Sequence, residues 1–325
     1  MKPAFLVMNK PAGITSHDVV AAVRAVTGIK KVGHTGTLDP FATGVLPLAL
    51  GPATRLIQFV DESIKVYDAT ISLGTATDTG DPTGVVVREA PLPTADRAQV
   101  EAVLRTFLGA RMQEPPAYSA VKHEGKPLYH YARKGQEVRV AARPVTIHDL
   151  TIEEYDGKTL RITITCSRGT YARVLADEIA IALGSAGHLS ALERPRSGPF
   201  YLRDALSMEQ LAAMAAPDSG QSWNDVLISR SRGNTERVKW QSRDEVAAAL
   251  TPWIRRPIDV LSHLPLADVR PYDATRIKRG GTPPAPPPGV GFGSKYLCVC
   301  GDELLAVVEA TPRGPKMLRG MEEGT

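Results

Sequence analysis

The sequence predicts an α+β fold, in which helices flank a mixed or antiparallel sheet and a smaller β-rich domain follows at the C-terminus. Segments with helical spacing of apolar residues and segments that alternate every two residues are mixed through roughly the first 200 residues. No βαβ unit and no other repeat recurs along the chain. Alternating segments return near the C-terminus. These three observations favour a sheet with flanking helices over a doubly wound parallel sheet.

The first expected helix follows Thr15 and ends at Gly28. Thr15 and Asp18 have the spacing of a capping box, and glycine is the residue that most often ends a helix. The apolar face of this helix is formed by valines at helical spacing, namely Val19, Val20, Val23 and Val26.

Two strands and two more helices are expected before residue 200. A two-residue period over 66–73 predicts a half-buried strand with Tyr67 on its apolar face, and a similar period covers 160–166. Apolar residues at helical spacing predict one helix over 100–108 and another that ends at Gly184.

The character of the chain changes after residue 212. Residues 213–258 are polar and are expected to be a linker or an insertion of unknown role. The run 280–289 is too rich in proline for regular structure, and two alternating segments joined at Gly301 predict a hairpin. We therefore expect a main domain over 1–212 and a small β-rich domain over 259–325.

The composition is that of an ordinary globular protein, with 43% hydrophobic and 23% charged residues. No apolar run reaches about 18 residues and no signal-peptide core is present, so we expect a cytoplasmic protein without a membrane span. Cys298 and Cys300 share one face of an alternating segment. Because no further Cys or His lies near them in the sequence, we interpret them as small apolar side chains and expect no metal site.

Basic and aromatic side chains are concentrated between Arg111 and Arg143. This segment has seven Lys or Arg and three Glu, a surplus of four that equals the net charge of the chain, +4. Tyr118, Tyr129 and Tyr131 lie among them. Such a mixture can bind phosphates and stack on bases of RNA, and it is equally typical of a solvated loop whose tyrosines pack on the core. The residues alone leave both interpretations open.

One carboxylate, Asp39, lies in a loop that is rich in Gly, Thr and Pro and is bracketed by apolar residues. Because an isolated carboxylate is costly to desolvate, we expect Asp39 either to take part in a reaction or to form hydrogen bonds with the nearby backbone. The second interpretation is supported by the following proline, since Asp-Pro is a common turn former. A reacting carboxylate needs a cationic partner. Arg173 is a candidate because it follows a strand and opens a helix, although a surface arginine has the same sequence context.

Four segments of the chain form one ordered set of motifs. They are Lys10-Pro11-x-Gly13-x-Thr15-Ser16, Gly33-His34-Thr35-Gly36-Thr37-Leu38-Asp39-Pro40-x-Ala42-Thr43-Gly44-Val45-Leu46-Pro47, Pro115-Pro116-x-Tyr118-Ser119-Ala120-x-Lys122 and Cys166-Ser167-Arg168-Gly169-Thr170-Tyr171-x-Arg173. Together they resemble the bacterial TruB family of tRNA pseudouridine synthases. The resemblance covers about residues 3–210, with a weaker match at the C-terminus.

The resemblance implies roles for single residues. Asp39 matches the catalytic aspartate, Tyr67 the tyrosine that stacks on the target base and helps to remove its C5 proton, and Arg173 the arginine that pairs with the aspartate and lowers its pKa. Asp81 also falls in a family motif, without a clear role. The residues that the resemblance places at the substrate are His34, which helps to displace the target nucleotide, Tyr67, Tyr171, Leu192 and Lys10.

For the whole chain, the resemblance implies a pseudouridine synthase domain over 1–212, with an insertion over 111–143 that grips the tRNA. A small PUA-like β-barrel over 259–325 would bind RNA. The expected reaction converts the uridine at position 55, in the T arm of tRNA, by flipping the base and replacing the C1′–N1 bond with a C1′–C5 bond. It needs no cofactor. We expect a monomer that acts on tRNA without an obligatory protein partner.

The chemistry of such a reaction agrees with the residue types. It needs a carboxylate beside sugar and base, a stacking surface, and protection of the cleaved intermediate from water. Asp39 between apolar neighbours and Tyr67 on an apolar strand face provide these features. Attack of the aspartate on C1′, a glycal route and attack on C6 all remain open.

Three other functions compete with this one: an RNA chaperone without chemistry, a guide-RNA-dependent synthase with protein partners, and a glycoside hydrolase. The hydrolase needs two carboxylates, and the motif offers one, while the basic segment 111–143 favours recognition of tRNA without a guide. Three features depart from the family. Asn9 stands where the family commonly has Asp, residues 215–250 have no counterpart, and the proline run interrupts the PUA-like region.

Overall fold

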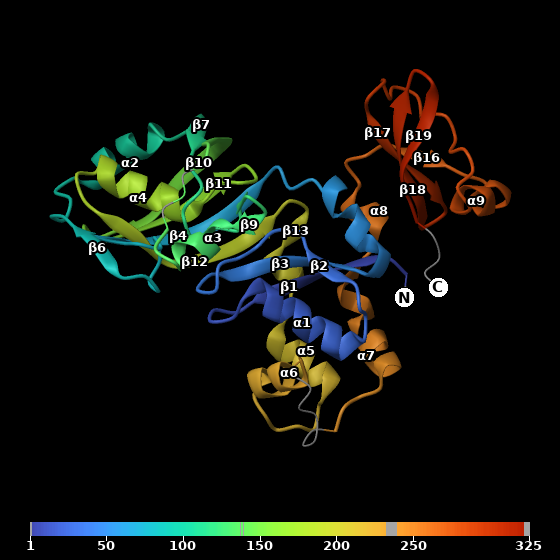
Figure 1. Cartoon of the computed structure of the whole chain (residues 1–325), viewed down its shortest axis with the longest axis horizontal. Helices are drawn as coiled ribbons and strands as arrows, with labels where there is room; N and C mark the ends of the chain where they lie inside the picture. The colour runs from blue at the N-terminus through green and yellow to red at the C-terminus, as the bar shows by residue number, and fades with distance from the viewer. Residues whose placement is uncertain (1, 137, 139, 232–238, 322–325) are drawn as a thin grey trace.

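The computed structural model describes residues 2–136, 138, 140–231 and 239–321. Figure 1 shows a wide sheet flanked by helices, a group of helices beneath its N-terminal strands, and a smaller sheet at the C-terminal end. Parts of three predicted segments lie outside the described residues, namely 137 and 139 of the basic segment, 232–238 of the polar segment and 322–325 of the C-terminal domain.

The described residues form one large mixed sheet, as predicted. Its strand order is β14-β1-β3-β12-β4-β11-β10-β7, with β2 paired to β3, β13 to β12 and β15 to β1. The pairs β1–β14 and β3–β12 are parallel and the others are antiparallel. The strands are β1 Ala4–Lys10, β2 Val32–His34, β3 Thr43–Leu50, β4 Lys65–Leu73, β7 Gly109–Gln113, β10 Arg143–Tyr155, β11 Thr159–Cys166, β12 Gly187–Ser197, β13 Phe200–Tyr201, β14 Leu206–Ser207 and β15 Ile254–Arg255.

Helices and two small hairpins surround this sheet. The hairpins are β5 Thr75–Thr77 with β6 Val86–Glu89, and β8 Lys122–His123 with β9 Lys126–Pro127. The α-helices up to the C-terminal sheet are α1 Ser16–Thr27, α2 Arg97–Arg105, α3 Leu128–Ala132, α4 Ala172–Ala182, α5 Met208–Ala215, α6 Trp223–Ser231, α7 Arg243–Leu250 and α8 Pro257–Val260, and the 3₁₀-helices are η1 Gly51–Phe59, η2 Leu202–Asp204 and η3 Thr251–Trp253.

The first predicted elements are confirmed. Thr15 and Asp18 form the capping box of α1, and Gly28 ends the helix with a φ of 71°, in the left-handed region that favours glycine. Strand β4 alternates buried and partly exposed residues, with Tyr67 on the buried face. The helix predicted over 100–108 lies about three residues earlier in the structure. Helix α2 begins at Arg97 and ends at Arg105, and its C-cap is Thr106.

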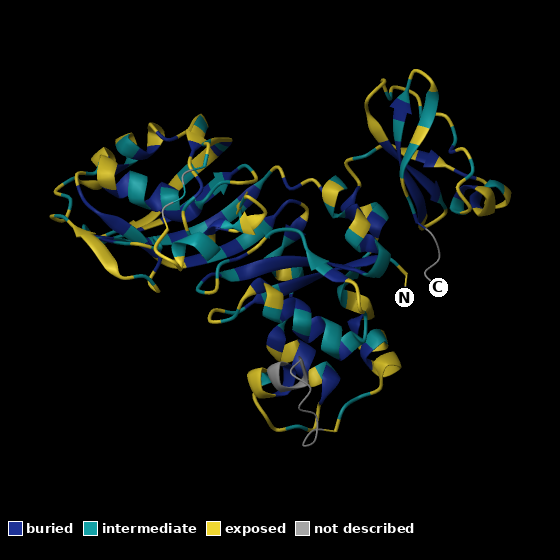
Figure 2. Ribbon diagram, viewed as in Figure 1, coloured by how far each residue is buried: buried dark blue, intermediate teal, exposed yellow. Residues whose placement is uncertain are grey.

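The large sheet is buried on both faces where β1 and β3 run (Figure 2). Alternate residues of β1 point to opposite sides, so Leu6 and Met8 pack in the core that includes the helices α1 and α4. Phe5 and Val7 pack in a second core, which is shared with η1, α8 and the C-terminal sheet. Strand β3, which begins just after Asp39, is therefore fixed from both sides, as is its neighbour β1.

The C-terminal part is a four-stranded sheet with one helix. Its order is β16-β17-β18-β19, and the predicted hairpin is confirmed by the antiparallel pair β17–β18. Residues 281–287 of the proline run form neither helix nor strand, and the carbonyl of Pro284 accepts a hydrogen bond from the Tyr296 hydroxyl at 2.6 Å. The elements are β16 Leu266–Asp268, α9 Pro271–Lys278, β17 Lys295–Cys300, β18 Glu303–Thr311 and β19 Gly314–Gly320.

The interpretation of 213–258 as a linker is wrong for its described part. Helices α6 and α7 pack against α1 and α5, and Val226, Leu227, Val246 and Leu250 are fully or almost fully buried in the main core. Each short helix has only a few apolar residues that face the core. The mean hydropathy of the whole segment is therefore polar, although these residues are buried. Among the described residues, no helix is long and apolar enough to span a membrane.

Replacing Leu227 with Ala is expected to destabilise the whole main domain. Leu227 is 0% exposed on α6, and removing a buried leucine typically costs about 2–5 kcal/mol. Asn224→Ala, on the exposed side of the same helix, should change the free energy of unfolding by less than about 0.5 kcal/mol. Urea denaturation of both variants measures the difference. Equal stabilities would mean that the helix is peripheral to the fold.

Candidate active site

Asp39 lies in the loop over residues 35–42 that joins β2 to β3, here called the Asp39 loop. Its backbone is bound from three directions. Ser16, at the start of α1, donates to the carbonyl of Leu38 at 3.0 Å and accepts from its N–H at 2.9 Å. The Arg194 guanidinium donates to the carbonyls of Gly36 and Thr37, at 3.0 and 3.3 Å. Because these bonds engage the backbone, the loop has a fixed course that does not depend on its side chains.

Lys10 supplies the third set of contacts to this loop. Its side chain is 0% exposed, and its ammonium donates to the carbonyls of Pro11, Ile14 and Pro40 at 2.8, 2.8 and 3.1 Å. Burial lowers the pKa of Lys10 to about 8, and nearby Asp39 opposes this shift. The expectation that Lys10 contacts substrate is therefore corrected. A fully buried ammonium bound to three carbonyls braces the residue after Asp39 and does not reach a ligand.

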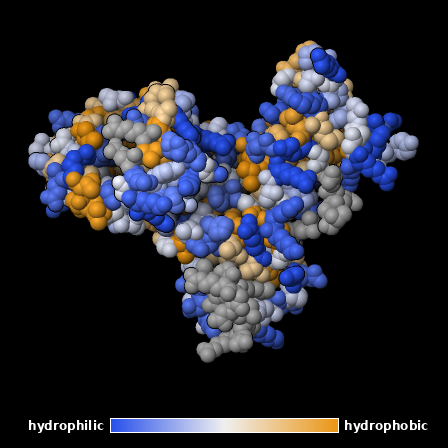
Figure 3. All heavy atoms as spheres, in the orientation of Figure 1, coloured by the Kyte–Doolittle hydropathy of each residue, from blue (hydrophilic) through white to orange (hydrophobic). Residues whose placement is uncertain are grey.

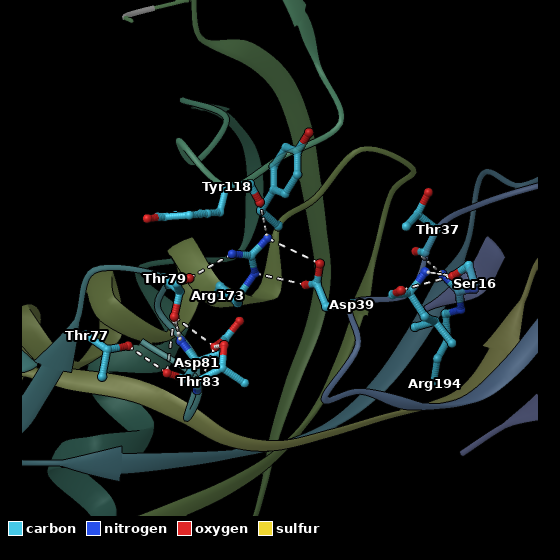
Figure 4. Close-up of polar contacts among 12 residues, drawn as sticks. Ser16, Thr37, Asp39, Thr77, Thr79, Asp81, Thr83, Tyr118, Arg173 and Arg194 are labelled. Carbon is cyan, nitrogen blue, oxygen red and sulfur yellow. Dashed lines mark hydrogen bonds and ion pairs between the residues drawn. The ribbon is translucent and has the colours of Figure 1, made fainter. Parts of the chain in front are cut away.

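Asp39 and Arg173, far apart in the sequence, form a two-pronged ion pair (Figure 4). Arg173 Nε lies 2.9 Å from Asp39 Oδ2, and Nη2 lies 3.4 Å from Oδ1. The same guanidinium donates to the carbonyls of Thr79 and Tyr118, at 2.7 and 2.8 Å. Arg173 is only 5% exposed, whereas a third of the Asp39 side chain, 33%, is exposed. The arginine is thus fixed in place, and it presents a carboxylate that stays open on one side.

The pKa of Asp39 is raised, chiefly by burial, although Arg173 opposes the shift. Arg173 thus acts on the pKa of Asp39 in the expected direction, but the effect of burial is larger and the net shift is upward. Asp81 also raises the pKa of Asp39. Removing the guanidinium would leave Lys10 as the remaining group that opposes the effects of burial and Asp81 on this carboxyl.

Asp81 lies close to Arg173 and shapes the backbone turn that Arg173 contacts. Its Oδ1 accepts hydrogen bonds from the Thr79 hydroxyl at 2.8 Å and from the N–H and hydroxyl of Thr83 at 2.9 and 2.6 Å. These bonds shape the turn that presents the Thr79 carbonyl to Arg173 (Figure 4). Asp81 therefore orients the arginine through the backbone, without touching it in the part of the chain that the structure describes.

A cavity of about 300 Å³ opens at the exposed side of Asp39. This volume is at the lower end of small-molecule pockets and suits a single nucleotide. Tyr67, from β4, and Leu192, from β12, line it together with Tyr171 and Arg173, which begin α4. Burial raises the pKa values of Tyr67 and Tyr171, so both hydroxyls stay protonated near neutral pH. The structure thus brings together five of the residues named from the sequence.

His34 lies at the edge of this group, on β2 next to the Asp39 loop, and does not line the cavity. Its pKa is lowered by burial and by nearby Arg194, so the imidazole is neutral. Its Nδ1 is buried without a hydrogen-bond partner among the described residues. A buried polar atom without a partner is costly, so this nitrogen remains available for a hydrogen bond to a ligand.

Three charged cavity residues escaped the sequence analysis: Arg194, Glu62 and Lys65. Arg194 is 1% exposed, and besides the loop carbonyls it donates to the carbonyl of Val45 at 2.9 Å. A charged residue inside an alternating strand is the one signal that could have singled it out, since charges are rarely buried without partners. Glu62 and Lys65 form a buried ion pair whose atoms are 3.6 Å apart.

The basic segment adjoins the cavity. Ser119 and Ala120 line it, and the neighbouring carbonyl of Tyr118 accepts from Arg173. Beyond them, Arg133 stacks on the Tyr129 ring, 5.5 Å from its centroid. Tyr129 is 42% exposed. At least one tyrosine of the basic segment is therefore not packed on the core.

The comparisons with known proteins agree with this geometry. The family model described as the N-terminal domain of TruB family pseudouridylate synthases matches residues 24–172. A tRNA pseudouridine synthase B of Geobacter sulfurreducens is 42% identical over 279 residues, which are 86% of this chain and 82% of that protein. A protein of the same name from Geotalea uraniireducens is 50% identical over 208 residues, 64% of this chain and 67% of that protein.

Solved structures give the fold independently. A chain of an H/ACA RNP bound to a substrate RNA containing 2′-deoxyuridine superposes with a TM-score of 0.68 at 22% identity, covering 98% of this chain and 85% of that chain. A chain of a Cbf5-Nop10-Gar1 complex has a TM-score of 0.64 at 24% identity, covering 95% and 78%. At this level of identity the two structures establish the fold, and the predicted α+β architecture is confirmed.

Proposed function

This chain belongs to the TruB family of pseudouridylate synthases, and from that premise we propose that it converts the uridine at position 55, in the T arm of tRNA, to pseudouridine. Isomerisation of uridine in tRNA follows from relatives at 42% and 50% identity that are named tRNA pseudouridine synthase B. The observation that carries the proposal is the Asp39–Arg173 pair at the mouth of a cavity that suits one nucleotide.

Asp39 is the residue that we propose to react. Its carboxylate must be ionised to act, whether at C1′, through a glycal or at C6, and Arg173 opposes the effect of burial that favours the protonated form. The net change breaks C1′–N1 and forms C1′–C5, so the base loses its C5 proton and gains one at N1. Cavity walls formed by Tyr67 and Leu192 limit the water that could capture a cleaved sugar.

The base must leave its stack before it can reach Asp39. Unstacking costs a few kcal/mol, and the Tyr67 ring can return about 1–3 kcal/mol by stacking on the base. We propose that His34 helps to displace the nucleotide, since it lies beside the Asp39 loop with an unsatisfied ring nitrogen. Tyr171, held at both backbone polar atoms by Gln113, forms another side of the cavity.

Two surfaces are proposed to contact the rest of the tRNA. The first is the basic segment 111–143 beside the cavity. The second is a groove lined by Arg55, Lys278 and Arg319, where the C-terminal sheet meets η1. Figure 3 shows hydrophilic side chains at the end of the C-terminal part where Figure 1 places α9. Basic grooves of this kind follow a phosphate backbone, which supports an RNA-binding role for the proposed PUA-like domain over 259–325.

We also propose that the protein acts as a monomer in the cytoplasm, where tRNA is modified, without an obligatory protein partner. The basic segment supports this, because it offers phosphate contacts from within the chain. The two structural neighbours were solved as RNA–protein and protein–protein complexes, so a requirement for partners is the competing proposal.

Incubation with unmodified tRNA tests the function directly. We expect pseudouridine at one position, 55, when the product is mapped by chemical modification and primer extension. The control is the same tRNA with cytidine at that position, which should give no product. Pseudouridine elsewhere would contradict the proposed site, and its absence from every position with purified protein would contradict activity without partners.

A further inference from the structure

An ion pair between Glu62 and Lys65 lines the cavity, and the reaction proposed above gives it no role. Glu62, in the loop before β4, and Lys65, the first residue of β4, both line the cavity. Glu62 Oε1 lies 3.6 Å from Lys65 Nζ, and only 3% and 8% of the two side chains is exposed. A buried ion pair is a weak source of stability. Its place in the cavity puts both charges within reach of a bound ligand.

Lys65 lies next to the proposed stacking surface. Alternate residues of a strand share one face, so Lys65 and Tyr67 point to the same side of β4. The absence of a side chain at Gly36 makes room for the ammonium, because a Cβ there would lie 2.7 Å from Lys65 Nζ. Burial lowers the pKa of Lys65 to about 8, so the ammonium is mostly charged at neutral pH.

The pair retains one acceptor and one donor for a ligand. Oε1 of Glu62 accepts from the Thr35 hydroxyl at 2.6 Å and from the Ser197 hydroxyl at 3.3 Å. Lys65 Nζ donates to the same Ser197 hydroxyl at 3.3 Å. Among the described residues, Glu62 Oε2 makes no hydrogen bond, and the ammonium of Lys65 has three hydrogens for its two neighbours.

Resting on the proposed function, we propose that Glu62 and Lys65 bind the imide edge of the flipped uracil. Glu62 Oε2 accepts from N3–H, and Lys65 donates to the adjacent carbonyl oxygen O4. Flipped bases are read at this edge in other enzymes that act on nucleotides. Cytosine has an acceptor at N3 and a donor at N4, so it presents the opposite polarity to both residues. The pair thereby selects uridine.

The same contacts can persist while the base turns. Exchange of N1 for C5 is a half-turn about the axis through N3 and C6, which leaves N3–H in place and exchanges O4 for O2. Glu62 therefore contacts the atom on the axis throughout, and Lys65 meets a carbonyl oxygen before and after the turn. A base that leaves C1′ with its bonding electrons carries negative charge on these oxygens, and a fixed ammonium stabilises that charge.

Binding without turnover tests this assignment. In an Asp39→Asn background, the full-length protein is titrated with a T-arm hairpin that has either U or C at the target position. We expect at least about tenfold tighter binding of the U hairpin. Adding Glu62→Gln should reduce the ratio below about threefold, because an amide can either accept or donate. Glu101→Gln is the control, since Glu101 pairs with Arg97 and Arg105 on α2, outside both the cavity and the basic segment.

The proposal would be overturned if folded Asp39→Asn/Glu62→Gln protein kept the full preference for the U hairpin. It would also be overturned if the Asp39→Asn protein itself bound the U and C hairpins equally well. A second measurement needs no variant. The unaltered enzyme should convert a hairpin with N3-methyluridine at least about tenfold more slowly than the uridine hairpin, and undiminished conversion would overturn the proposal. Conversion of the uridine hairpin itself tests the proposed function separately, because the binding ratio is measured without turnover.

Discussion

Asp39→Asn is expected to abolish pseudouridine formation and to leave tRNA binding within about threefold of the unaltered protein. Asparagine has the shape of aspartate but cannot attack carbon or take a proton, and losing the reacting group of an enzyme lowers turnover by at least about 10⁴-fold. The loop is held by backbone bonds from Ser16, Lys10 and Arg194, so its course does not depend on the carboxylate. Single-turnover assays and filter binding with the same tRNA measure the two effects.

A matched substitution separates the role of Asp39 from a general effect of losing a carboxylate. Asp156→Asn changes an aspartate in the turn between β10 and β11, whose carboxylate accepts from the backbone of Lys158 and Thr159. This variant should keep turnover within about twofold, because surface changes outside the site have small effects. Turnover of Asp39→Asn within tenfold of the unaltered enzyme would refute the assignment of Asp39 as the reacting residue.

The sequence predicts the class of fold and the centre of the site because both depend on local patterns. The capping box of α1, the alternation of β4 and the loop around Asp39 are each contained in fewer than about 15 consecutive residues. Arg173 is also found from its own motif. That it meets Asp39 is a long-range fact, since the two residues are separated by 134 positions. The sequence predicts this contact only because the ordered motifs resemble a known family in which the two residues pair.

The residues that support the site could not be assigned in the same way. Lys10 belongs to a motif and was expected at the substrate, yet its ammonium is bound to backbone carbonyls. A motif does not distinguish a residue that contacts a ligand from one that fixes the loop beside it. Glu62 and Lys65 lie three residues apart in an ordinary polar sequence, and only burial within the cavity makes their charges unusual.

The error over 213–258 has a physical cause as well. The segment looks polar on average, and short amphipathic helices place only a few side chains in the core. Trp223 and Trp240, both packed against that core, were the available signal. Together with Trp253, which packs against the same core, they make three tryptophans in a polar stretch. This number favours packing over a flexible linker, since large aromatic side chains contribute much of the buried area in cores.

Arg173→Met is expected to lower turnover by about 10²–10³-fold and to move the acid limb of the pH–rate profile to higher pH. Only ionised Asp39 reacts, so the rate falls as the pH drops through the pKa of that carboxyl. Burial already raises this pKa, and the guanidinium is the main group that opposes it. Without the arginine the pKa rises further, and a higher pH is needed for the same ionised fraction. Rates measured across the pH range on one tRNA report the shift.

Arg88→Met is the control for this variant, because Arg88 pairs with Asp177 on the same helix α4 but lies outside the cavity. Its acid limb should coincide with that of the unaltered enzyme. The acid limb and the turnover of Arg173→Lys should lie between those of Arg173→Met and those of the unaltered enzyme. A lysine retains the charge that favours the ionised carboxylate, but it lacks the fork that also binds the carbonyls of Thr79 and Tyr118. If Arg173→Met lost activity with no shift of the acid limb, the arginine would position Asp39 without controlling its ionisation.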